Sequence, residues 1–122
     1  MKNKEVGVEG EKLAQGYLIK QGYEIIEINK RFSRFCEIDI IAKHKDVLIF
    51  VEVKTRSNRS GGYPEEAVGN TKIQNLQAAI AYYLQINKPK GIESIRVDVI
   101  SIMFDKAKMP RIYHIKNITI DS

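Results

Sequence analysis

The sequence has few of the features that identify secreted or membrane proteins. It contains one cysteine, Cys36, and no tryptophan among its 122 residues. A single cysteine excludes an internal disulfide and favours a reducing compartment. No window approaches the roughly 18 apolar residues of a membrane-spanning helix. The first twelve residues, MKNKEVGVEGEK, lack the apolar centre of a signal peptide. We therefore expect a cytoplasmic protein without a membrane partner.

Repeats and low-complexity segments are also absent, and there are only three prolines. We expect residues 1–122 to form a single domain, because a chain of this length buries about two-thirds of its unfolded surface. The net charge of +5 and the pI near 9.3 suit a polyanionic partner, and nucleic acid is the commonest one. On charge alone, a merely soluble basic protein is an equally good interpretation.

Hydrophobic periodicity predicts two helices and five strands. The predicted helices are 8–21 and 71–86; the predicted strands are 23–31, 37–43, 46–54, 94–103 and 111–120; a loop is expected at 57–64. Short turns join the first three strands into an antiparallel meander. The second helix then acts as a crossover to a strand parallel to the third. The fold class is α/β, a mixed central sheet flanked by helices.

The hairpin of 37–43 and 46–54 carries the most informative side chains. We expect a four-residue turn at 43–46, which sets Ala42 opposite Val47. Side-chain alternation then places Asp39, Glu52 and Lys54 on one face, with the two acids about 7–8 Å apart as diagonal neighbours. Glu52 and Lys54 lie in the run LIFVEVKTR, residues 48–56, so Glu52 is a carboxylate within an otherwise apolar strand.

Two carboxylates on adjacent strands require a cation between them. Asp and Glu oxygens suit Mg²⁺ or Mn²⁺, and the Val53 carbonyl could add a further ligand. Lys54 would lie beside the metal, and Glu11 of the first helix could complete its shell. This chemistry suits phosphodiester hydrolysis. Flanking phosphates could be held by nearby basic residues: Arg31, Arg34, Arg56, Arg59 and Lys72.

Structural interpretations compete with these functional ones. Lys54 could simply form an ion pair with Asp39 or Glu52, and an Asp followed by Glu-x-Lys is common by chance. Lys72 could equally be a surface lysine. Asp98 is expected to be the structural partner of an arginine or a helix end, His44 a turn residue and His114 a surface residue. Tyr82 and Tyr83 are expected on the helix surface and in the core rather than as base-stacking platforms.

The motifs taken together resemble those of the PD-(D/E)xK nucleases, the restriction-endonuclease-like superfamily. More narrowly, the chain resembles the YraN-type family of small, largely uncharacterised proteins predicted to be endonucleases, which is similar to archaeal Holliday-junction resolvases. The resemblance covers residues 5–103 and rests on Gly10-Glu11 with Ala14, Gly22-Tyr23, Asn29 with Arg31, Glu37-Ile38-Asp39, Phe50-Val51-Glu52-Val53-Lys54-Thr55-Arg56, Ala67-Val68, Lys72 and Val97-Asp98-Val99.

The resemblance implies a Mg²⁺-dependent endonuclease acting on DNA, with branched DNA and repair intermediates among its substrates. It implies metal binding by Asp39 and Glu52, a catalytic Lys54 and an assisting Glu11. Resolvase-like relatives often act as dimers, which leaves a homodimer open here. The family usually has glycine immediately before its Glu-Ile-Asp, whereas this chain has Cys36, so we expect an altered start of the strand.

Two other functions stay open. The chain could be a nuclease-like module that binds nucleic acid without cleaving it, which salt-sensitive binding without products would indicate. It could instead be a protein-interaction scaffold using the sheet edge or the second helix. A scaffold would have no salt-dependent affinity for DNA.

Overall fold

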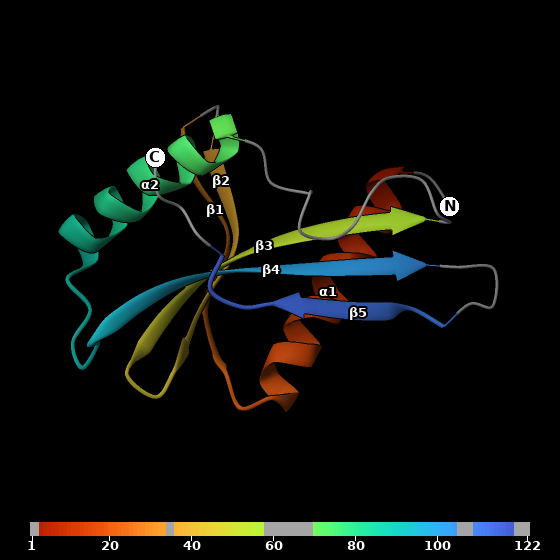
Figure 1. The fold of residues 1–122 in the computed structure, drawn as a ribbon, viewed down its shortest axis with the longest axis horizontal. Helices are drawn as coiled ribbons and strands as arrows, with labels where there is room; N and C mark the ends of the chain where they lie inside the picture. Colours follow the sequence, from red (N-terminus) through yellow and green to blue (C-terminus); the bar gives the residue numbers. More distant parts are fainter. Residues whose placement is uncertain (1–2, 34–35, 58–69, 105–108, 119–122) are drawn as a thin grey trace.

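The structure is a computed structural model that describes residues 3–33, 36–57, 70–104 and 109–118. The elements follow the predicted order (Figure 1). They are α1 Asn3–Lys20, β1 Glu24–Ser33, β2 Cys36–His44, β3 Val47–Ser57, α2 Asn70–Asn87, β4 Ser94–Phe104 and β5 Arg111–Ile115. The last strand is shorter than predicted, and Ser57 belongs to β3 rather than to a loop. Residues 58–64 of the predicted loop lie outside the described part.

The five strands form one mixed sheet in the order β1-β2-β3-β4-β5. The first three are an antiparallel meander. Strand β4 pairs with β3 in parallel, from Val47 beside Ser94 to Ser57 beside Phe104, and β5 returns antiparallel. The helix α2 precedes β4 in the crossover, as the pattern predicts. The fold is therefore α/β, consistent with a restriction-endonuclease-like core. Within the described ranges no helix is long and apolar enough to cross a membrane.

The two helices cover opposite faces of the sheet. Leu48 and Phe50 of β3 belong to one buried cluster with Leu76, Ala79, Ile80 and Tyr83 of α2. Ile49 and Val51 belong to the other cluster, with Ala14 and Leu18 of α1. Because neighbouring strand residues point to opposite faces, these memberships assign one helix to each face. Each helix thus packs its buried apolar residues against one face of the sheet.

The β2–β3 register differs from the predicted one by two residues. The strands meet at a two-residue turn, Lys45 and Asp46, and Ala42 pairs with Ile49 rather than with Val47. Lys45 adopts a left-handed φ of 57°, a conformation in which glycine or asparagine would be the usual signal. A two-residue shift keeps each side chain on its face, so most of the predicted face assignments survive.

Candidate active site

The strands β2 and β3 separate at Asp39. Their last pair is Ile40 with Val51, and Asp39 and Glu52 are the next residues along the two strands. The Asp39 carboxylate turns to the neighbouring backbone, where its Oδ2 accepts a hydrogen bond from the Val53 amide at 2.8 Å. We call this place, defined by Asp39, Glu52 and Val53, the fork. It brings the predicted aspartate directly against the backbone of the predicted Glu-x-Lys segment.

The facing of β2 also changes at the fork. Ile40 and Ala42 pack on the α1 side. In a regular strand Ile38 would lie on the same side, because it is two residues from Ile40. Ile38 instead joins Cys36 and Ile41 in the cluster on the α2 side. Regular alternation would place Ile38, Ile40 and Ala42 on one face, and it does not hold for Ile38. The strand leaves regular alternation where it leaves its partner.

Glu52 is a buried carboxylate with a lysine beside it. Its exposed fraction is only 4%, and the Lys54 Nζ lies 3.6 Å from its Oε1, while the Lys54 side chain is one-third exposed. Burying a carboxylate is unfavourable unless a charge or hydrogen bonds offset it. The Glu52–Lys54 ion pair considered as a structural alternative is thus present. It also holds the amine at the fork, where a catalytic lysine is expected.

Glu11 is delivered to this region by a close approach of α1 to β3. A Cβ atom added to Gly10 would lie 2.1 Å from Thr55 Oγ1 and 3.0 Å from Thr55 Cβ, so only glycine allows this spacing. Burial raises the pKa of Glu11, a hydrogen bond with Asn29 opposes that shift, and the charges of Glu37 and Glu52 raise it further. Glu11 therefore interacts electrostatically with the acids on β2 and β3.

The donors at the fork are of the kind that Mg²⁺ accepts. Asp39 and Glu52 supply carboxylate oxygens, and Val53 has a backbone oxygen between Glu52 and Lys54. Across the described residues, however, no three His, Cys, Asp or Glu side chains gather as a metal-binding group. The two carboxylates of the fork, without Glu11 as a third, are the best candidate for holding a cation.

The predicted phosphate-binding residues are only partly described. Arg31 on β1 is exposed, and its Nη2 lies 3.6 Å from Glu37 Oε2. Arg56 is half-buried on β3, two residues beyond Lys54. Arg34 and Arg59 lie outside the described residues, and so does the side chain of Lys72.

Cys36 occupies the position of the usual family glycine without a positive φ. It starts β2 opposite Ser33, is buried, and its Sγ donates to the Asn75 carbonyl oxygen of α2 at 3.5 Å. Cys36 thus contributes a buried contact between β2 and α2.

A buried network around Asp98 was only partly anticipated. As predicted, Asp98 pairs with an arginine: Arg96 Nε and Nη2 donate to its two oxygens at 2.9 and 3.0 Å. The His114 side chain, predicted at the surface, is instead only 5% exposed, and its Nε2 lies 2.7 Å from Asp98 Oδ2. Tyr17 of α1 contacts His114 Nδ1 through its hydroxyl at 3.0 Å.

The sequence predicted a partner for Asp98 but not the contact of Asp98 with His114. A carboxylate inside an apolar strand pointed to Asp98, but its contact with His114 depends on how β4 and β5 pair. His44, expected in the turn, ends β2 and stacks on Tyr23 with ring centroids 4.6 Å apart. Arg96 Nη2 also donates to the Tyr23 hydroxyl at 2.7 Å, which joins these rings to the network.

Known proteins similar to this chain provide a separate comparison. The model of an uncharacterised protein family, UPF0102, matches residues 10–102. A UPF0102 protein of Syntrophomonas wolfei is 44% identical over 115 residues, covering 94% of this chain and 97% of its own. A UPF0102 protein of Clostridioides difficile is 45% identical over 118 residues, covering 96% and 98%. These names state no activity.

Proposed function

The chain belongs to the UPF0102 family, which is the YraN-type family that its motifs resemble, and we propose its function from its own residues. The description of the family names no activity. We propose that it is a metal-dependent endonuclease that hydrolyses phosphodiester bonds in DNA, with branched and repair intermediates among its substrates. The observation that carries the proposal is the fork. There the Asp39 carboxylate binds the amide next to the buried Glu52, and Lys54 adjoins Glu52.

Asp39 and Glu52 would hold the Mg²⁺ ion, with Mn²⁺ as a substitute, and the Val53 carbonyl would be a further ligand. Bound there, the ion would polarise the scissile phosphate and offset its charge. The Val53 amide orients Asp39 by its hydrogen bond. Lys54, which is one-third exposed, can turn its amine from Glu52 to negative charge developing on the phosphate. Glu11 adds negative charge near the fork and helps to attract a cation.

Isosteric variants test the fork. We expect Asp39→Asn and Glu52→Gln each to lower metal-dependent cleavage of plasmid and branched DNA by at least about a hundredfold, as loss of a key electrostatic group does. Far-ultraviolet circular dichroism should show that both variants remain folded. Glu24→Gln, at an exposed position of β1, is the matched control and should cleave normally. Full cleavage by both fork variants would remove these carboxylates from the mechanism.

One observation favours a second candidate, a nuclease-like module that binds DNA without cleaving it. In the described part of the chain the acids do not form a three-ligand group, so the site offers few protein ligands. Incubation of the pure protein with linear and branched DNA, in Mg²⁺ and in Mn²⁺, separates the two functions. Salt-sensitive binding without products would support the module, and binding insensitive to salt or absent would support a scaffold.

A further inference from the structure

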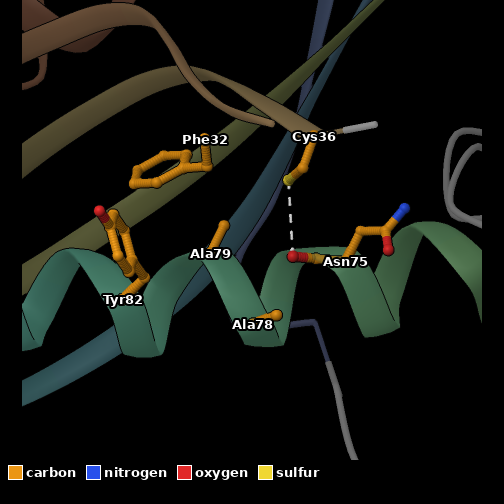
Figure 2. A pocket seen from close by; sticks show the side chains of 6 residues that line it. All are labelled: Phe32, Cys36, Asn75, Ala78, Ala79 and Tyr82. Atoms are coloured by element: carbon orange, nitrogen blue, oxygen red, sulfur yellow. Dashed lines mark hydrogen bonds between the residues drawn. The ribbon is translucent and has the colours of Figure 1, made fainter. Parts of the chain in front are cut away.

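Two hollows lie on either side of a pair of aromatic rings between β1 and α2. The first, of about 180 Å³, is lined by Phe32, Cys36, Asn75, Ala78, Ala79 and Tyr82 (Figure 2). The second, of about 300 Å³, shares Phe32 and Tyr82 and adds Lys30, Arg31 and Ile86. Phe32 and Tyr82 therefore separate two adjoining spaces, one of them bordered by basic residues.

The rings are held in place by the core beneath them. Phe32 and Tyr82 meet edge to face, with centroids 6.2 Å apart and planes at 89°. Phe32 also contacts the buried Tyr83, which in turn contacts Phe50 of β3. Tyr82 is nevertheless 55% exposed. Phe32 is thus packed against the core, and Tyr82 extends the aromatic surface into solvent, where a flat ligand can stack on it.

The charged residues that line the second hollow, Lys30 and Arg31, are basic, and each forms an exposed ion pair that a phosphate could replace. Lys30 lies 3.5 Å from Glu27, and Arg31 lies 3.6 Å from Glu37. The Lys30 side chain is 43% exposed and the Arg31 side chain 63%. Ion pairs this exposed contribute little, so either cation can transfer to a phosphate at small cost.

We propose that the two hollows form a groove for a single-stranded segment of the DNA substrate. Unpaired bases would stack on Phe32 and Tyr82, a role that the sequence did not predict for Tyr82, while Lys30 and Arg31 bind the adjacent phosphates. Stacking on aromatic side chains combined with basic residues is how proteins bind single strands without sequence preference. A duplex does not fit this description, because its bases are already stacked inside the helix. The inference rests on the proposed function and names the substrate class of the same site.

The groove adjoins the fork through Arg31. Its guanidinium reaches Glu37, which is two residues from Asp39 on β2, or about 7 Å along a strand. Glu37 is also one of the charges that act on Glu11. A single DNA strand bound in the groove would therefore extend toward the fork. The cleaved bond would then lie close to a junction of single-stranded and double-stranded DNA.

Binding to labelled DNA in the presence of a chelator tests the groove separately from cleavage. The probes are a single-stranded oligonucleotide and a blunt duplex of the same sequence, followed by fluorescence anisotropy. We expect Tyr82→Ala to weaken single-strand binding by about tenfold, the effect of losing one stacked base, and duplex binding by less than about twofold. Tyr82→Phe should restore binding. Tyr113→Ala, at another exposed tyrosine on β5, is the matched control and should bind normally.

The outcomes separate the groove from the proposed activity. Equal losses on both probes, or no loss, would overturn the groove even if the protein cleaves DNA. A Tyr82-dependent preference for single strands, without cleavage in any metal, would support the groove and overturn the nuclease. Unchanged DNA binding, together with a Tyr82→Ala shift in oligomeric state by sedimentation, would make the groove an interface between copies of the chain and overturn the inference.

Discussion

At the scale of single residues, Asp98 shows how this fold accommodates a fully buried carboxylate. Burial alone would raise the pKa of Asp98, but hydrogen bonds from His114, Arg96 and the Asn117 amide outweigh it and lower that pKa below its usual value. The ionised form is therefore the one the folded chain prefers. Asp98 uses its neighbours to stabilise its charge, whereas Glu52 has Lys54 at a longer distance.

We expect Asp98→Asn to destabilise the protein by about 3 kcal/mol at pH 7, because it leaves Arg96 partly buried without its counter-charge. The pKa of Asp98 is lowered in the folded state, so its stabilising effect is present above its unfolded pKa and is lost as the pH falls through the folded one. The difference between wild type and variant should shrink in acid. Urea unfolding between pH 7 and pH 3 measures it.

Glu9→Gln, at an exposed position of α1, is the control for that series. A difference between wild type and Asp98→Asn that stays constant across this pH range would show that the ionisation of Asp98 does not contribute. A difference that grows in acid would contradict the sign of the shift.

At the scale of elements, the sequence predicted faces better than registers. Alternation in 46–54 identified which residues of β3 share a face, and the two clusters bear this out. Alternation repeats every two residues, so it cannot distinguish registers two residues apart. The turn could have done so, but Lys45 adopts its left-handed φ without the glycine or asparagine that would have marked it. The irregular facing at Ile38 has no signal in the sequence either.

The close approach of α1 to β3 gives a prediction about two glycines of one helix. We expect Gly10→Ala to destabilise the fold, because the added methyl group would collide with the Thr55 side chain and push α1 away from the sheet. Gly16→Ala meets no atom within 4 Å and should stabilise by about 1 kcal/mol, since alanine favours helix over glycine. Thermal unfolding of both variants checks this.

The double variant Gly10→Ala/Thr55→Ala identifies the cause. It removes the two nearest Thr55 atoms and should recover part of the stability. Equal effects of alanine at positions 10 and 16 would mean that the helix can move away from Thr55 without cost.

At the scale of the whole molecule, charge gives a prediction that does not depend on cleavage. With a net charge of +5, the logarithm of the binding constant for duplex DNA should fall linearly with the logarithm of salt concentration. If Arg31 and Arg56 each contact one phosphate, Arg31→Ala and Arg56→Ala should each reduce the slope by about 0.9. Lys20→Ala, at the far end of α1, should not. Titrations at several salt concentrations measure the slopes, and unchanged slopes would exclude the two arginines from the interface.

The parallel pairing of β3 with β4 has a consequence for the order in which the molecule forms. During synthesis the meander can assemble early, because its partners are close in sequence and short loops close readily. The other side of β3 has no partner until Ser94–Phe104 has been made. A nascent chain that ends before that segment would contain Asp39, Glu52 and Lys54 on a three-stranded meander in which one edge of β3 is still unpaired. The sheet around the fork would thus be completed only late in translation.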